Sequence, residues 1–254
     1  MCVMCSDIHV WGDSLARGIL YNEQKERYAI SRERCVNRLE KELNRKVINH
    51  SNMGATVLDG LQLFEAFTPE PGALNAVEFG GNDCDLDWRY VSEHPNEPVK
   101  ARVELTDFEA GLSMFVAEIR ARGMRPMLIT PLPLDPQKYF MWVTRGLNAD
   151  NVLTALGDVN HIYRWQERYA NAVRSVALAT HCRLLDLRDA FLAQPKYDQL
   201  MCIDGIHPND EGHKVLADAA LAMARASACD QRELTLEEAE GAHLTAIPSA
   251  AKVG

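Results

Sequence analysis

The sequence predicts an α/β protein, a three-layer α/β/α sandwich around a central, mostly parallel, five-stranded sheet. Two observations carry this prediction. Short apolar runs rich in β-forming residues alternate with amphipathic stretches of helical period along most of the chain. The connections between successive runs are long enough to hold a helix, which makes neighbouring strands parallel and covers both faces of the sheet.

Five apolar runs are predicted strands, and helical segments separate them. The strands are expected at residues 8–11, 46–49, 73–79, 127–130 and 184–187. The helices are expected at residues 31–44, 56–67, 106–122, 160–181, 188–193, and from 209 or 210 to 226. Ser31 can cap the first helix, and Thr106 with Glu109 can form a capping box for the third. Leu58 is expected on the inward face of the second helix.

Three stretches lack a clear period. Residues 14–27 are expected to form a loop with helical turns, and residues 84–105 and 134–157 are expected to form long loop insertions. The insertions hold five aromatic residues, Trp88, Tyr90, Tyr139, Phe140 and Trp142. Either these rings stack on a sugar or line an acyl pocket, or they pin the loops to the domain, and the sequence favours neither interpretation.

Length and composition predict one globular domain over residues 1–254. A chain of 254 residues, 47% hydrophobic and 25% charged, is large enough for one substantial core. That core is expected over about residues 7–227, and the small residues near the end predict a peripheral tail over about residues 228–254.

Charge and cysteine content exclude several classes of partner. A net charge of −9 argues against nucleic acid and anionic membranes. No apolar run approaches the roughly 20 residues of a membrane span, and no secretory signal is visible, so a cytoplasmic protein is predicted. Seven cysteines without a regular framework indicate free thiols, and Cys2 with Cys5 is interpreted as a plain terminal pair. The oligomeric state stays open, a homo-oligomer included.

Four short motifs lie at or beyond the ends of predicted strands, where sites form in parallel sheets. They are Gly12-Asp13-Ser14, Asn52-Met53-Gly54-Ala55, Gly80-Gly81-Asn82-Asp83 and Asp204-Gly205-Ile206-His207-Pro208. Ester hydrolysis needs a nucleophile, a base, a group that orients the base, and donors for the oxyanion. Ser14 can be the nucleophile, His207 the base and Asp204 the group that orients it.

The candidate oxyanion donors are the backbone N–H groups of Ser14 and Gly54 and the side-chain amide of Asn82. A side chain at position 54 would crowd the approach to the reacting carbonyl, whereas Asn82 donates from its NH2 group. Gly205 permits a tight bend in the last motif. Asp13 is expected to hold the turn before Ser14 and to take no chemical part.

Together and in this order, the four motifs resemble the blocks of the SGNH (GDSL-type) hydrolases. They span the chain from the first strand to the last helix. The resemblance implies a flavodoxin-like fold and a catalytic set made of Ser14, Gly54, Asn82 and His207. It also implies hydrolysis that requires no metal and no cofactor.

Two polar clusters could be interpreted as metal sites. Asp83, Asp85 and Asp87 lack the glycine and the terminal glutamate of a calcium loop. Asp210 and His213, which follow His207, are expected at a helix start and on its exposed face. Both clusters are predicted to be solvated polar segments, and no metal site is predicted.

The sequence therefore predicts a serine esterase that cleaves short acyl esters of a small-molecule substrate, with acetyl groups on a carbohydrate favoured. A lysophospholipase or acyl-thioesterase is the first alternative, since each buried CH2 of a longer chain adds about 0.8 kcal/mol. A catalytically silent binding module on the same fold is the second.

Overall fold

The computed structural model describes residues 6–226, and a parallel sheet of five strands lies at its centre. The strands lie in the order β4 (Val47–Asn49), β1 (Ile8–Gly12), β5 (Leu74–Glu78), β6 (Arg125–Ile129) and β7 (Arg183–Leu185). All four neighbouring pairs are parallel. The predicted α/β fold with a five-stranded sheet is confirmed. Cys2, Cys5, Cys229 and the tail predicted over 228–254 lie outside the described residues.

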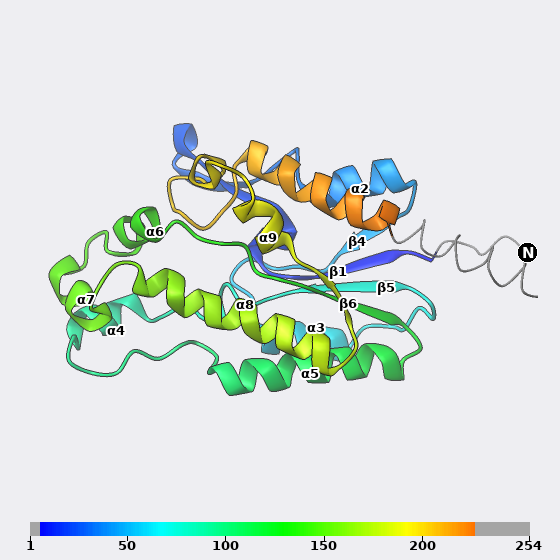
Figure 1. Ribbon diagram of the computed structural model, residues 1–254, viewed down its shortest axis with the longest axis horizontal. Coiled ribbons are helices and arrows are strands. Elements are labelled where there is room, and N and C mark those ends of the chain that lie inside the picture. The colour runs from blue at the N-terminus through cyan, green and yellow to red at the C-terminus, as the bar shows by residue number, and fades with distance from the viewer. Residues whose placement is uncertain (1–5, 227–254) are drawn as a thin grey trace, which may run out of the picture.

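Three helices cover one face of the sheet: α3 (Val57–Glu65), α5 (Leu105–Ala121) and α8 (His161–Ala179). Figure 1 shows them together below the strands. The buried residues of this layer include Trp11, Val77 and Leu128 from strands and Phe64, Phe108, Phe115 and Tyr169 from helices. Side chains alternate between the faces of a strand, so Trp11 and Val77 point into this layer while their neighbours Val10 and Ala76 point into the other.

The opposite face is covered by α2 (Cys35–Leu43), by a helix over residues 210–226 and by α9 (Leu187–Leu192). In Figure 1 the first two lie side by side above the sheet. Polar contacts join them, because Arg38 donates to Asp218 over 2.7 Å. Ser31, just before α2, donates to Asp210 over 2.5 Å. The first part of the chain is thereby tied to the last described helix.

A third group of helices lies beyond one end of the sheet: α4 (Trp88–Glu93), α6 (Pro136–Val143) and α7 (Ala149–Leu156). They enclose a small core of their own, which includes Val91, Tyr139 and Val152. The prediction of irregular insertions over 84–105 and 134–157 is therefore wrong in part. Each helix has a side-chain cap, from Asp87, Asp135 and Asn148 respectively. These capping signals were present in the sequence.

The predicted loop over residues 14–27 is also corrected. It holds the short helix α1 (Ser14–Arg17) and then β2 (Ile19–Asn22), η1 (Glu23–Lys25) and β3 (Arg27–Ile30). The two strands β2 and β3 pair antiparallel as a hairpin apart from the main sheet. A second 3-10 turn, η2 (Tyr197–Leu200), precedes the last motif.

Two predicted helix starts and one predicted inward residue are wrong. The helix α2 begins at Cys35 without a side-chain cap, and Ser31, which lies before it, donates to Asp210 and accepts the backbone N–H of Glu33. The helix α5 begins at Leu105, also without a side-chain cap, so the predicted pair of Thr106 and Glu109 forms no capping box. Leu58 is 49% exposed and faces away from the core.

Candidate active site

The first and last motifs meet at the carboxyl end of β1. The Nε2 atom of His207 lies 2.9 Å from the Oγ atom of Ser14, although the two residues are 193 positions apart in the chain. The Nδ1 atom of His207 lies 2.6 Å from Oδ2 of Asp204. All three side chains are buried. The predicted residues Ser14, His207 and Asp204 therefore lie at hydrogen-bond distances from one another, in the order that a serine, histidine and aspartate triad requires.

Hydrogen bonds from backbone N–H groups to Asp204 stabilise the turn that carries His207. Oδ1 of Asp204 accepts hydrogen bonds from the backbone N–H groups of Ile206 and His207 at 3.2 and 3.1 Å. Gly205 has a φ of +73°, and a Cβ there would lie 2.6 Å from the backbone nitrogen of Tyr139. The predicted tight bend at Gly205 is confirmed, and it needs glycine because of both the backbone angle and the close approach.

The electrostatics of Asp204 favour its charged form. Burial alone would raise the pKa of this carboxyl group, but the hydrogen bond and charge of His207 and the two backbone donors outweigh burial and lower the pKa below its usual value. A carboxylate that stays ionised holds the Nδ1–H of His207 and leaves Nε2 to accept a proton from Ser14.

Asn82 is held by Asp13. The Nδ2 atom of Asn82 donates to Oδ2 of Asp13 over 2.8 Å, and Oδ1 of Asp13 accepts the backbone N–H of Leu15 over 2.8 Å. One carboxylate therefore caps α1 behind Ser14 and uses one of the two amide N–H groups of Asn82. The other N–H of that amide remains for a ligand. Sequence reasoning placed Asp13 in the turn but missed its bond to Asn82.

Gly54 lies on the loop after β4, and this loop is tied to β1 because the backbone N–H of Asn52 donates to the carbonyl of Gly12 over 3.1 Å. Gly54 has a φ of +79°, a left-handed backbone conformation that glycine adopts more readily than other residues. Within residues 6–226, apart from Gly54 and its two chain neighbours, no atom lies within 4 Å of a Cβ built at this position. That a side chain here would crowd a bound substrate stays a prediction.

A small cavity of about 70 Å³ opens beside Ser14. It is lined by Asn82 and His207 and by residues that sequence reasoning did not select, among them Leu134, Leu156, Ile162, Trp165 and Gln166. Of the five insertion aromatics, Trp88 and Tyr139 line this cavity. Both also bond to Asp85, at 2.9 and 2.7 Å, so they fix the loop and shape the cavity at the same time.

A ring cluster from the hairpin packs beside His207. The ring of Tyr28 lies 5.1 Å from that of His207, and Trp142 lies 4.7 Å from the ring of Tyr21. Burial and then the negative charge of Asp204 raise the pKa of Tyr28. Sequence reasoning missed Tyr28 because it missed the hairpin.

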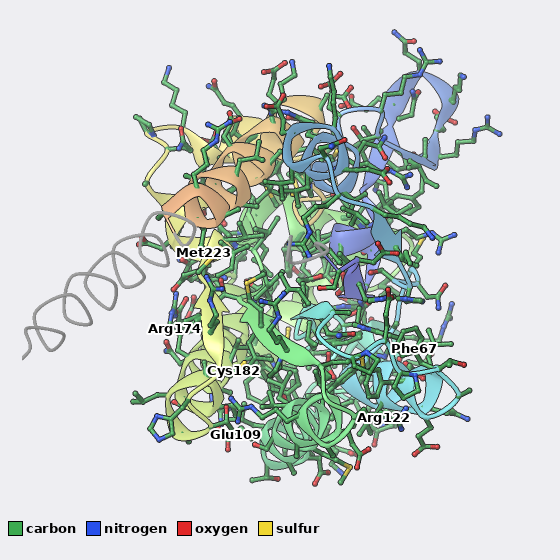
Figure 2. The ribbon with its side chains drawn as sticks, turned by 90° about the vertical axis from the view of Figure 1, so that its right-hand side faces the viewer. Phe67, Glu109, Arg122, Arg174, Cys182 and Met223 are labelled. Carbon is green, nitrogen blue, oxygen red and sulfur yellow. The ribbon has the colours of Figure 1, made fainter. Side chains whose placement is uncertain are left out.

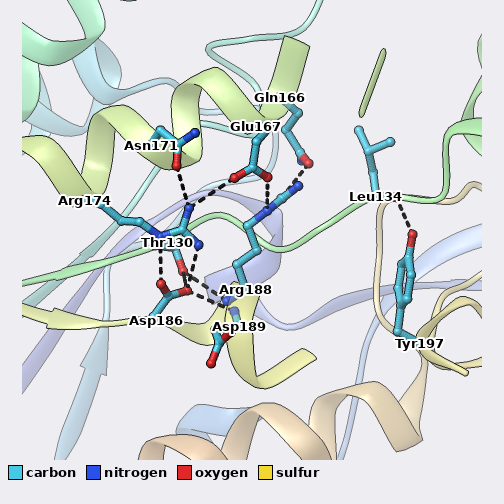
Figure 3. Close-up of polar contacts among 10 residues, drawn as sticks. All are labelled: Thr130, Leu134, Gln166, Glu167, Asn171, Arg174, Asp186, Arg188, Asp189 and Tyr197. Atoms are coloured by element: carbon cyan, nitrogen blue, oxygen red, sulfur yellow. Dashed lines mark hydrogen bonds and ion pairs between the residues drawn. The ribbon is translucent and has the colours of Figure 1, made fainter. Parts of the chain in front are cut away.

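A buried arginine, Arg188, contacts Gln166, which lines the cavity. Figure 3 shows the polar contacts of this arginine. Arg188 of α9 is fully buried, and its guanidinium contacts Glu167 at 2.7 Å and Gln166 at 2.9 Å, both on α8. Its backbone N–H donates to Oγ1 of Thr130 at the end of β6. A buried charge requires such pairing, and here the pairing fixes Gln166 at the cavity.

The two clusters predicted to be solvated are buried only in part, because Asp83 and His213 are buried whereas Asp87 and Asp210 are exposed. Asp83 is fully buried and accepts the backbone N–H groups of Val57 and Gly80 at 2.9 and 3.0 Å, and burial raises its pKa to about 7. Asp87 caps α4. His213 is 0% exposed. The predictions of solvation for Asp83 and of an exposed face for His213 are wrong, because both side chains are buried.

Several further features concern the described residues as a whole. Within residues 6–226, no three His, Cys, Asp or Glu side chains gather as candidate metal ligands. Across the same part of the chain, no helix combines the length and the apolar character needed to cross a membrane. Cys35, Cys84, Cys182 and Cys202 are free thiols.

Comparison with known proteins agrees with this geometry. The profile of the GDSL-like lipase/acylhydrolase family matches residues 10–215. Among solved structures, a lipase/acylhydrolase from Enterococcus faecalis is 20% identical with a TM-score of 0.61, over 87% of this chain and 96% of that one. An acetylxylan esterase from Geobacillus stearothermophilus is 21% identical with a TM-score of 0.58, over 85% of this chain and 93% of that one. No match was found among curated proteins.

The fold and the site define an ester-hydrolysing enzyme of the SGNH type. More particularly, the chain belongs to the GDSL-like lipase/acylhydrolase family, whose profile matches more than half of its length.

Proposed function

We propose that this protein is a serine esterase that removes short acyl groups, acetyl above all, from a carbohydrate or similar neutral alcohol. The observation that carries the proposal is the size of the cavity beside Ser14. Its volume of about 70 Å³ is room for a few waters, because one water needs roughly 10–15 Å³ of such space. A space of this size favours an acetyl group over a long acyl chain.

The reaction follows from the hydrogen bonds already described. The Oγ atom of Ser14 attacks the ester carbonyl while Nε2 of His207 takes its proton. The protonated imidazole then gives that proton to the leaving alcohol, and an acyl group remains on Ser14. Water, deprotonated by His207, attacks the acyl-enzyme, and the acid leaves with Ser14 restored. Asp204 keeps its charge throughout and stabilises the imidazolium.

Three donors are proposed for the oxyanion: the backbone N–H groups of Ser14 and Gly54 and the free N–H of Asn82. The bond from Asn82 to Asp13 supports this role, because it holds the amide in place before substrate arrives. A donor held in advance costs no reorganisation during the reaction.

The aromatic side chains around the site support a sugar-like alcohol. Trp88, Tyr139 and Trp165 line the cavity, and flat rings of this kind can stack on a sugar. Structural neighbours of this chain include acetylxylan esterases, which supports the same choice. The net charge of −9 suits a neutral substrate, and the free buried thiols suit a reducing, cytoplasmic location.

The test compares p-nitrophenyl acetate, butyrate, octanoate and palmitate, followed by acetylated xylooligosaccharides, with the wild type and Ser14→Ala side by side. We expect kcat/KM to fall as the acyl chain lengthens and activity to vanish in the variant. Rates that rise with chain length would favour a lysophospholipase or thioesterase. If wild type showed no turnover and Ser14 failed to react with a fluorophosphonate, the protein would be a binding module.

A further inference from the structure

A second cavity, much larger than the one beside Ser14, lies between the sheet and the layer formed by α2 and the helix over residues 210–226. Its volume is about 350 Å³. Among residues 6–226, Leu15 alone lines both this cavity and the catalytic one. The large cavity is therefore a separate compartment, and nothing in the proposed reaction uses it.

The floor of the cavity is made by alternate residues of neighbouring strands. Ile8 and Val10 of β1, Leu74 and Ala76 of β5, and Met127 of β6 line it. Residues two apart in a strand share a face, so these side chains present a continuous apolar surface. The roof is apolar as well, with Val36 and Leu39 from α2 and Leu216 and Ala220 from the last described helix.

One end of the cavity is basic. The cavity is lined there by Arg45, Arg125 and Arg183. These arginines lie at or just before the first residues of β4, β6 and β7, so they are at the amino ends of the strands, whereas Ser14 is at the carboxyl end of β1. Figure 2 looks at the molecule from this end, with Met223 labelled on the helical layer above the sheet. Arg125 and Arg183 are exposed, so this end opens to solvent.

Backbone carbonyl groups orient two of these arginines. The Nε and Nη2 atoms of Arg45 both donate to the carbonyl of Ser6, and the Nε atom of Arg125 donates to the carbonyl of Gly72 over 3.0 Å. Among residues 6–226, neither has a carboxylate partner within ion-pair distance. A guanidinium offers its remaining N–H groups to a carboxylate in a fixed fork.

The inner end of the cavity reaches Glu78, the last residue of β5. Burial and then the neighbouring Asp13 raise the pKa of the Glu78 carboxyl group well above its usual value, which favours the uncharged form of the group. From Leu74 to Glu78 the strand spans about 13 Å. With carbon–carbon bonds of about 1.5 Å, an extended chain of roughly ten carbons covers that distance.

We propose that this cavity binds a free medium-chain fatty acid, with its tail along the sheet and its carboxylate at Arg45 and Arg125. The apolar walls match an alkyl chain, and the basic end matches a single negative charge. A volume of about 350 Å³ lies within the ~300–1,000 Å³ of ligand pockets. This inference is independent of the proposed esterase reaction.

The test is calorimetric titration of the full chain with hexanoate, octanoate and decanoate below their micellar concentrations. The protein is first reacted with a fluorophosphonate so that the catalytic pocket is closed. We expect one saturable site, with a dissociation constant that falls roughly fourfold for each added methylene. Decanol, which has the same chain and no charge, should bind more weakly than decanoate.

Variants test the basic end and the apolar floor of the cavity separately. Arg125→Gln and Arg45→Gln should each weaken decanoate binding by about tenfold. The matched control is Arg32→Gln, an exposed arginine that does not line the cavity and should leave binding unchanged. Ala76→Phe fills the floor and should abolish binding, with circular dichroism to show that the variant folds.

Three results would overturn the proposal. The first is the absence of saturable decanoate binding, as expected if a part of the chain after residue 226 or a second copy fills the cavity. The second is binding that occurs in untreated protein and disappears after the fluorophosphonate reaction, because it would place the fatty acid in the catalytic pocket. The third is equal binding by wild type and both arginine variants.

Discussion

The imidazole of His207 contacts a hydroxyl on one side and a carboxylate on the other, and these two distances allow a prediction for each residue. Ser14→Ala or His207→Ala should lower kcat by roughly 10⁴ to 10⁶, because each removes a group whose bond is made or broken. Asp204→Asn should cost less, because it leaves nucleophile and base in place. Steady-state hydrolysis of p-nitrophenyl acetate measures all three, and near-normal turnover by Ser14→Ala would remove the mechanism.

The link between Asp13 and Asn82 allows a second prediction. Asn82→Ala should lower kcat by roughly 10² to 10³ with little change in KM, because an oxyanion donor acts in the transition state. Asp13→Asn should reproduce part of that loss, since an amide in place of the carboxylate no longer holds the Asn82 N–H firmly. Both variants should keep the wild-type melting temperature within a few degrees. A raised KM with unchanged kcat in Asn82→Ala would assign this residue to ground-state binding.

At the residue scale, motif reasoning predicted the candidate catalytic groups that lie together in the structure and missed the groups that hold them. Ser14, Asn82, Asp204 and His207 are recognisable because few side chains can do their work. The residues that line the cavity, such as Leu156 and Trp165, are apolar residues on helices and look like any core residue in the sequence. Their placement depends on tertiary packing, which no local pattern records.

Among the elements, α3 carries a capping box that directly follows the Gly54 loop. The backbone N–H of Thr56 donates to Asp59 over 2.8 Å, and the Asp59 N–H donates to Oγ1 of Thr56 over 3.4 Å. Thr56→Ala should lower the free energy of unfolding by about 1 kcal/mol. Urea denaturation measures this change.

A matched control exists on α5. Thr106 stands in a sequence that also predicts a capping box, yet α5 begins one residue earlier and has no side-chain cap. Thr106→Ala should therefore leave the free energy of unfolding unchanged within about 0.5 kcal/mol. Equal losses in Thr56→Ala and Thr106→Ala would mean that the cap on α3 contributes nothing specific.

The elements that sequence reasoning missed share a physical cause. The strands β2 and β3 are short, and they are stabilised by rings such as Trp142 that come from far along the chain. The helices α4, α6 and α7 have cap signals, but each is only two turns long, so the hydrophobic period is weak. The five strands and long helices, by contrast, have apolar patterns that are strong enough to see locally.

For the whole molecule, the sheet was predictable because long helical connections allow only parallel pairing. The contacts between distant parts of the chain were not predictable from the sequence. His213 shows this, since its Nε2 atom lies 3.4 Å from the carbonyl of Ile19, 194 positions away. Sequence reasoning placed this histidine on an exposed face because its period on the helix suggested nothing else.

Burial of His213 makes global stability depend on pH. Burial lowers its pKa from 6.5 to about 4, so the folded protein holds it neutral while the unfolded chain binds a proton more readily. The contribution of the buried, neutral His213 to the free energy of unfolding is fully present above pH 6.5. It is lost as the pH falls towards about 4. The loss is on the order of 3 kcal/mol.

The measurement is thermal or urea unfolding of wild type and His213→Gln across that pH range. A glutamine can donate to the same carbonyl and does not titrate, so the variant should lose less stability in acid. His50, whose pKa is also lowered to about 4 by burial, keeps part of the acid sensitivity in both proteins. The exposed His94→Gln is the control and should behave as wild type. Parallel pH profiles for wild type and His213→Gln would contradict this account.

The 193 positions between Ser14 and His207 have a consequence for the order of events when the chain is made. A ribosome releases Ser14, Gly54 and Asn82 early, but the candidate base His207 reaches Ser14 only after its own segment has emerged and closed a loop of 193 positions. Ester cleavage should therefore be the last property to appear during synthesis or refolding, after the circular dichroism of the helices has recovered.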